Sequence, residues 1–300
     1  AADRHEPARA WAPRLMQLPS FSPLDYFANL VHEDARLPLL EAAVSVAQDE
    51  VPDLDVQGVL AEVDRLGQRL RARLPREATP PQRLAALSQF FHVELGFQGN
   101  VNDYYAPVNS FIHYVLETRR GLPISLAILL LELAEQAGLR AAGVAFPGHF
   151  LVKFRIGLGD VVMDPFSGDA LTQSRLEERL QIYRRGSGLP DDLELPLEFF
   201  LRGTPRRHIL ARLLRNLKEI YRSAEDWPRF LAVQRRLVIL LPDDAGELRD
   251  RGLALEALGQ WEAAADDLDA YLRRQAEAVD APQLRERLKA LGRRHPPRRR

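Results

Sequence analysis

The sequence predicts an α+β core that lies between a helical N-terminal region and an all-α C-terminal region. Three observations support this prediction. Apolar residues recur at helical spacing over residues 21–73, they alternate with other side chains over residues 150–156, and a tryptophan motif returns after 34 residues near the C-terminus. Since 300 residues exceed the usual size of one domain, about 100–200 residues, we expect several structural units.

The composition is typical of a water-soluble globular protein, with 46% hydrophobic and 28% charged residues. The 41 basic and 42 acidic residues give a net charge of -1, so the overall charge favours neither nucleic acid nor a membrane surface. The longest apolar run, residues 126–131, is far shorter than the roughly 20 residues that span a bilayer. We therefore expect no nucleic-acid partner, no membrane partner and a cytoplasmic location, and the oligomeric state stays open.

Residues 21–80 predict a helical N-terminal region, which follows a flexible, proline-rich lead over residues 1–20. The letters PDLD at residues 52–55 separate two of its helices. Asp55 is suited to cap the second helix, because its short carboxylate accepts hydrogen bonds from the free N–H groups of a first turn. Prolines between residues 75 and 81 then interrupt the chain and end this region.

The core is expected over residues 81–200 and begins with a helix over residues 82–95 that stops at Gly96. A second, short helix is expected to end at Thr118, with Asn109 or Ser110 as its cap.

A third helix is expected to begin at Pro123, since proline is favoured at the first helical position. Residues 124–134 are almost all apolar, which predicts a helix buried on most sides. Ser125 and Glu132 interrupt this run seven residues apart and are expected to form a polar seam on one helix face.

Three short strands are predicted next, near residues 141–146, 150–156 and 161–163, with the letters GLGD at residues 157–160 as a hairpin turn. The simplest register around this turn places Lys153 opposite Asp164 and leaves His149 four residues short of direct pairing. A different register or a bulge is then needed for His149 to reach Asp164.

The C-terminal region, residues 205–280, predicts two helical hairpins of the tetratricopeptide type. WPRF at residues 227–230 and WEAA at residues 261–264 begin 34 residues apart, which is the period of that repeat. A final helix is expected over residues 282–291, within a segment 281–300 that ends in a basic tail. We interpret Trp227 and Trp261 as packing residues of the repeats and the tail as solvated.

Ser125, His149 and Asp164 are the candidate catalytic residues. Ser125 lies at the start of a predicted helix, and His149 and Asp164 follow after 24 and 15 residues. A serine nucleophile needs a histidine base and a carboxylate that orients the base, and this set supplies both. The chain contains no cysteine, so chemistry that requires a thiolate is excluded. The structural alternative is that all three residues only satisfy nearby backbone groups at a helix start, a turn and a strand end.

Three motifs carry a resemblance to a known family: GLPISLA at residues 121–127, GVAFPGHFLV at residues 143–152 and MDPF at residues 163–166. Together they resemble the bacterial SirB-type family, which joins a transglutaminase-like core to tetratricopeptide repeats, and the resemblance extends over residues 35–275. It implies a papain-like fold in which cysteine, histidine and aspartate carry out acyl transfer, and it maps these positions to Ser125, His149 and Asp164. Serine in the first position is the departure from that pattern.

Two functions follow from these observations. The preferred hypothesis is a transglutaminase-like domain without its catalytic cysteine, which acts as a non-catalytic or regulatory scaffold and binds a protein or peptide through the repeats. The alternative is a serine-dependent hydrolase or acyltransferase that uses Ser125, His149 and Asp164 on an amide or ester. No cofactor is predicted. No metal is predicted either, because His92 and His113 lack partners at ligand spacing.

Overall fold

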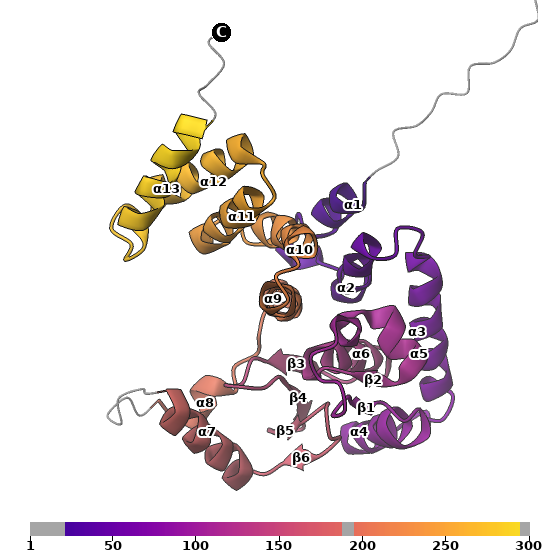
Figure 1. The fold of residues 1–300 in the computed structure, drawn as a ribbon. Helices are drawn as coiled ribbons and strands as arrows, with labels where there is room; N and C mark the ends of the chain where they lie inside the picture. The colour runs from indigo at the N-terminus through magenta and orange to yellow at the C-terminus, as the bar shows by residue number, and fades with distance from the viewer. Residues whose placement is uncertain (1–21, 188–194, 295–300) are drawn as a thin grey trace, which may run out of the picture.

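The computed structural model describes residues 22–187 and 195–294, and its helical N-terminal region, α+β core and helical repeats follow one another along the chain (Figure 1). The predicted flexible lead and the last six residues of the basic tail lie outside the described residues. Within the described part of the chain, no helix combines the length and the apolar content that crossing a membrane requires.

The N-terminal region consists of α1 (Pro23–Leu30), α2 (Leu39–Ser45) and α3 (Val56–Arg71). Asp55 caps α3 as predicted, since its carboxylate accepts a hydrogen bond of 2.9 Å from the Gly58 N–H. The side chains that α2 and α3 bury join the main hydrophobic cluster of the molecule, so these helices are part of the core packing.

The first helix of the core is α4 (Pro80–Ser88), which continues into a π-helical segment at Gln89–Glu94. Gly96 ends it with a φ of +72°, a conformation that glycine adopts without strain. The short helix is α5 (Ile112–Thr118), but the predicted caps were wrong. Asn109 and Ser110 belong to the preceding 3₁₀ turn, Pro107–Ser110, and α5 begins without a side-chain cap.

Helix α6 (Pro123–Gln136) begins at the predicted proline and is buried along most of its length. It packs against α3 on one side and against the sheet on another. The predicted polar seam does not form. The Ser125 hydroxyl forms hydrogen bonds with backbone groups in the core. Glu132 instead lies half-buried at a pocket and accepts a hydrogen bond of 3.0 Å from Gln136.

The main sheet is antiparallel in the order β3-β4-β5-β6, formed by β3 (Ala141–Val144), β4 (Leu151–Ile156), β5 (Gly159–Met163) and β6 (Ala170–Leu171). A second, parallel pair joins β1 (Gln98–Gly99) to β2 (Arg120–Gly121). The predicted register was wrong by two residues. Only Gly157 and Leu158 form the β4–β5 turn, so Lys153 pairs with Val162. If the ladder continued by one pair, Leu151 would lie opposite Asp164. His149 is therefore two residues short of direct pairing with Asp164, and not four.

Both faces of this sheet are covered (Figure 1). Phe150, Val152 and Phe154 belong to the main cluster around α6. The opposite face carries a smaller cluster, in which Leu151 and Val162 pack with side chains of α7 (Gln173–Ser187) and α8 (Leu197–Phe200).

The C-terminal region is all-α, with α9 (Arg206–Ser223), α10 (Trp227–Leu240), α11 (Ala245–Ala257), α12 (Trp261–Arg274) and α13 (Ala281–Arg294). The predicted repeat is confirmed, because Trp227 and Trp261 open the second helix of each hairpin. Buried Lys218 joins the hairpins through Glu247 at 2.6 Å and Asp250 at 2.7 Å.

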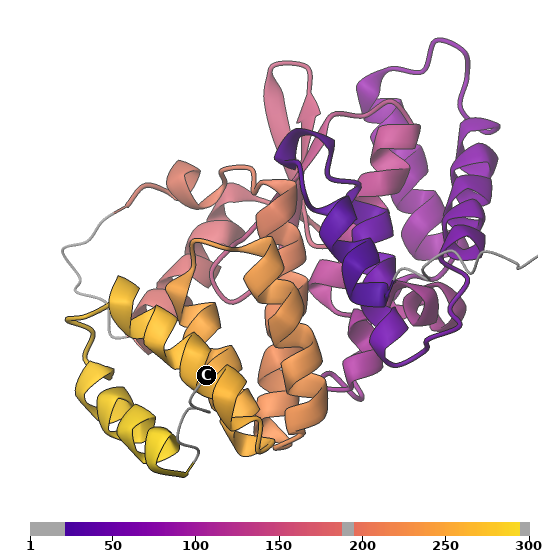
Figure 2. The same cartoon turned by 90° about the horizontal axis from the view of Figure 1, so that it is seen from above.

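The repeats also pack directly on the N-terminal region, as Figure 2 shows for the stack of α9 and α10 beside α1 and α2. Several polar links cross this boundary, and two of them lie near the end of the N-terminal 3₁₀ turn Val46–Asp49. Arg236 of α10 forms an ion pair with Asp49, and the Tyr221 hydroxyl donates to Glu50 at 2.8 Å. The first repeat helix is therefore part of the core packing.

Candidate functional site

His149 and Asp164 lie together at the end of the β4–β5 hairpin. His149 follows Gly148, whose φ of +70° turns the chain between β3 and β4, and Asp164 directly follows β5. The His149 Nε2 atom lies 2.8 Å from the Asp164 Oδ1 atom. Because Nε2 bonds the carboxylate, Nδ1 is the ring nitrogen that would have to face a nucleophile, and Nδ1 has no hydrogen bond to any described residue.

The Asp164 carboxylate is the most enclosed charge of this site, with a side chain that is 4% exposed. Besides His149, it accepts hydrogen bonds from the Phe166 N–H at 2.9 Å and from Arg179 of α7 at 3.0 Å. Burial alone would raise the pKa of Asp164. The hydrogen bond and charge of His149, the Phe166 N–H and Arg179 outweigh burial and hold this pKa below its ordinary value of 3.8, so the carboxylate is ionised at neutral pH.

Ser125 has other partners. Its hydroxyl donates to the Asn109 carbonyl oxygen at 2.6 Å and accepts from the Leu122 N–H at 3.0 Å, and the residue is 0% exposed. The same Asn109 oxygen also accepts from the Leu122 N–H at 3.3 Å. Among the described residues the hydroxyl makes no hydrogen bond with His149. The structure thus brings two of the three predicted catalytic residues together and holds the third on backbone groups at the start of α6.

His92 and His113, for which the sequence predicts no metal role, pack against phenylalanine rings. His92 Nδ1 lies 3.0 Å from the Phe97 carbonyl oxygen, and burial lowers the pKa of both His92 and His113. Within residues 22–187 and 195–294, no three His, Cys, Asp or Glu side chains are grouped so that they could hold a metal ion.

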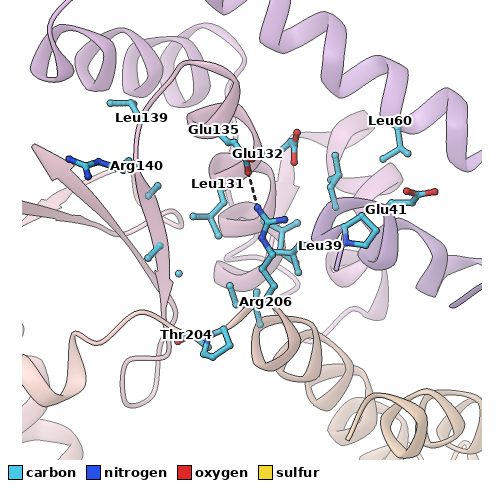
Figure 3. A pocket seen from close by; sticks show the side chains of 18 of the residues that line it. Leu39, Glu41, Leu60, Leu131, Glu132, Glu135, Leu139, Arg140, Thr204 and Arg206 are labelled. Carbon is cyan, nitrogen blue, oxygen red and sulfur yellow. Dashed lines mark hydrogen bonds and ion pairs between the residues drawn. The ribbon is translucent and has the colours of Figure 1, made fainter. Parts of the chain in front are cut away.

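A pocket of about 730 Å³ that the sequence did not reveal lies where α2, α3, α6, β3 and the start of α9 meet (Figure 3). Leu39, Leu60 and Leu131 give it an apolar lining. Acidic side chains also reach it from three different helices: Glu41, Asp64, Glu132 and Glu135.

The acidic side chains of this pocket differ in whether they form an ion pair. Glu135 forms an ion pair with Arg206 at 2.9 Å, the dashed contact in Figure 3. Glu41, Asp64 and Glu132 have no cation within ion-pair distance among the described residues. Asp64 and Glu132 instead share the Gln136 amide, whose Nε2 atom lies 3.0 Å from each carboxylate. Arg140 also lines the pocket, so its four acidic side chains outnumber its two arginines, and Glu41, Asp64 and Glu132 have no ion-pair partner among the described residues.

Sequence reasoning missed this pocket because Glu41, Asp64 and Glu132 are spread over about 90 residues and follow no motif. A second pocket, of about 640 Å³, lies between the Tyr104 and Tyr105 pair and the last turns of α9. Leu122, at the start of α6, lines it, whereas Ser125 is fully buried.

Comparisons with known proteins place the chain in a family. Residues 57–215 match the transglutaminase-like superfamily, and residues 217–289 match the tetratricopeptide repeat. A UPF0162 protein of Xylella fastidiosa strain 9a5c is 39% identical over 80% of this chain and 85% of its own length. The chain belongs to the UPF0162 family.

Similar UPF0162 proteins come from several other bacteria. The relative from Vibrio cholerae is 28% identical over 88% of this chain and 96% of its own length, and YchA of Escherichia coli K12 is 24% identical over 87% and 95%. A crystal structure of menin aligns with a TM-score of 0.42 and 10% identity over 87% of this chain and 67% of that chain, which is too distant to carry an argument. The resemblance and the fold class predicted from the motifs are confirmed, and the three candidate residues of this UPF0162 protein all lie within the transglutaminase-like match.

Proposed function

We propose that this UPF0162 protein is a non-catalytic, cytoplasmic scaffold that binds a protein partner. The observation that carries the proposal is the Ser125 hydroxyl, which is 0% exposed and donates its hydrogen to the Asn109 carbonyl at 2.6 Å. A serine becomes a nucleophile when its hydrogen points to a base that can take the proton. A backbone carbonyl cannot take it, and the only hydrogen of the hydroxyl is already used.

One N–H group at the start of α6, that of Leu122, is also unavailable to stabilise an intermediate of acyl transfer. Free N–H groups at a helix N-terminus stabilise the negative oxygen of a tetrahedral intermediate. Here the Leu122 N–H is bonded by the Ser125 hydroxyl and by the Asn109 carbonyl oxygen, which itself carries partial negative charge. The geometry favours a structural link between the 3₁₀ turn and α6.

The other two candidate residues, His149 and Asp164, fit the same role. Asp164 joins the turn before β4 to α7 through His149 and Arg179. Stacked helical hairpins present extended surfaces that suit protein segments, which supports a partner that is a protein. The chain also has no cysteine that could replace Ser125 as nucleophile.

A single engineered thiol tests the proposal, because the native chain has none to interfere. In Ser125→Cys, we expect a thiol reagent such as dithionitrobenzoate to react at least about 100-fold more slowly than in Ser174→Cys, an exposed serine of α7. Thermal melts of both variants check that they are folded. Comparable rates in two folded variants would show that the Ser125 position is open to a substrate and would contradict the proposal.

The alternative of a serine-dependent hydrolase or acyltransferase has its own readout. It requires Ser125 to leave the Asn109 carbonyl and to reach the His149 ring. A fluorophosphonate adduct on Ser125 of the native protein, found by mass spectrometry, would establish that alternative and exclude the scaffold as the whole function. We expect no adduct under conditions in which a control hydrolase is fully labelled.

A further inference from the structure

Strand β3 forms one edge of the four-stranded sheet, and the residues that line the 730 Å³ pocket include Ala141, Ala142 and Gly143 of this strand. In an antiparallel ladder, alternate residues direct their backbone groups to the neighbouring strand. The Arg140 carbonyl accepts a hydrogen bond from the Arg155 N–H of β4 at 2.9 Å. Counting in steps of two, Ala142 and Val144 also direct their backbone N–H and C=O groups to β4. Ala141 and Gly143 direct their backbone groups away from the sheet.

One end of this outer edge is already covered. The Thr204 N–H donates to the Gly143 carbonyl at 2.8 Å, and the Thr204 hydroxyl accepts from the Ala145 N–H at 2.9 Å. The other end is half-buried at Ala141 and buried at Gly143, and it carries unpaired backbone groups. The N–H and C=O of Ala141 and the N–H of Gly143 have no hydrogen-bond partner among the described residues. An edge strand with unpaired backbone groups is a template for a further strand.

Charge and shape restrict what can bind there. The pocket volume of about 730 Å³ lies within the range of roughly 300–1,000 Å³ that is usual for ligand sites. Its apolar lining accommodates aliphatic side chains or stems. Its four acidic side chains face only Arg140 and Arg206, and Asp64 and Glu132 form no ion pair, so the pocket keeps an excess of negative charge. An occupant that completes this site has a backbone able to pair with β3 and cationic side chains that reach the carboxylates. Polyanions such as nucleic acids are repelled by the same carboxylates.

We propose that the pocket binds an extended, basic segment of a partner protein, which adds to β3 as a further strand and places lysine or arginine side chains at Asp64 and Glu132. This inference rests on the proposed scaffold function and adds the place and the chemistry of the partner. Backbone hydrogen bonds to Ala141 and Gly143 supply the alignment, and the carboxylates supply the selection for positive charge. The site belongs to the transglutaminase-like domain and its junction with α9.

The test uses the full chain and a fluorescent nonapeptide of alternating valine and lysine, with a valine and glutamate peptide of the same length as the charge control. Fluorescence anisotropy is expected to show binding of the lysine peptide only. The double variant Asp64→Asn, Glu132→Gln keeps the shape of both side chains and removes their charge, so affinity should fall at least about tenfold. Glu262→Gln, which changes an exposed acid on α12, should leave affinity unchanged.

Ala141→Pro separates strand addition from simple charge attraction. Its ring removes the Ala141 N–H, which faces away from β4, so the β3–β4 ladder keeps its hydrogen bonds and edge strands accept proline there. Circular dichroism checks the fold of each variant. We expect the folded Ala141→Pro variant to bind the lysine peptide at least about tenfold more weakly, because the hydrogen bond to the Ala141 N–H is lost and the proline ring occupies the outer edge of β3.

Several results would overturn the inference. These are equal binding of the two peptides, unchanged affinity in the charge-removing double variant, or unchanged affinity in folded Ala141→Pro. Self-association of the native chain that Asp64→Asn, Glu132→Gln abolishes would assign the pocket to a second copy and would also overturn it. These results are distinct from those that test the proposed scaffold function. A fluorophosphonate adduct on Ser125 contradicts the scaffold function, whether or not the peptides bind. Absence of peptide binding without such an adduct contradicts only the proposed binding site.

Discussion

Replacing Asp164 by asparagine tests the part of the site where the structure places the most polar contacts on one side chain. The carboxylate accepts hydrogen bonds from His149, the Phe166 N–H and Arg179, and its side chain is 4% exposed. Asparagine keeps one acceptor oxygen and turns an NH₂ group towards donors. At least one donor then loses its partner, and the charge that Arg179 faces is gone.

The expected cost follows from these contacts. A hydrogen bond to a charged group contributes about 1.5–3 kcal/mol, and breaking a buried ion pair costs about 3–5 kcal/mol. The Arg179 side chain is 38% exposed, so water replaces part of what it loses and its share must be reduced. We therefore expect Asp164→Asn to lower the free energy of unfolding by about 2–4 kcal/mol.

Urea unfolding, followed by circular dichroism, measures this change. Asp169→Asn is the matched control, because Asp169 is an exposed carboxylate of the same loop that bonds the Ser167 hydroxyl at 3.0 Å. The control should stay within about 0.5 kcal/mol of the native chain. If Asp164→Asn is as stable as the control, the buried carboxylate does not hold the hairpin and α7 together, and the structural role assigned to it is wrong.

Three further predictions concern the same domain and the repeats. Because folding lowers the pKa of Asp164 below 3.8, its stabilisation is present above about pH 4 and is lost as pH falls through the folded pKa. Urea curves from pH 7 to pH 3 should therefore show the native chain and Asp164→Asn converging in acid, and a constant gap would contradict this linkage. Gly99→Ala should cost about 1–3 kcal/mol by thermal melting, since a Cβ there would lie 2.2 Å from the Phe166 ring, whereas Gly159→Ala, with open space around it, should cost less than about 1 kcal/mol. Lys218→Met removes the buried cation that Glu247 and Asp250 share, although nearby arginines still pair with both acids, and should cost about 1.5–3 kcal/mol in urea unfolding; unchanged stability would contradict this expectation.

Local rules predicted much of the fold because the relevant partners lie close in sequence. Asp55 caps α3 through an N–H three residues later, and Pro123 opens α6 because its fixed φ suits the first turn. The 34-residue spacing of Trp227 and Trp261 identified both repeat hairpins for a similar reason, since each hairpin mainly packs on its neighbour.

The sequence could not predict features that depend on distant contacts. The hairpin register depended on whether two or four residues form the turn, and a two-residue loop of Gly157 and Leu158 moved every pair by two positions. The pairing of β1 with β2 covers only two residues of each strand, which is too short to leave a periodic pattern. The acidic pocket needs three helices and an edge strand in place before its charges meet.

The Ser125 position shows why one motif predicts two opposite roles. A nucleophile and a helix-start link both require a small polar side chain in the first turn of α6, close to free N–H groups. Leu122 precedes the helix and has no side-chain acceptor, so the Ser125 hydroxyl bonds its N–H in either case. The proposed non-catalytic role rests on the Asn109 carbonyl, 16 residues earlier, which takes the hydroxyl hydrogen. Because a backbone oxygen makes that contact, no residue type in the sequence could predict it. In the proposed scaffold, His149 and Asp164 serve as a pair that links the hairpin to α7 through Arg179.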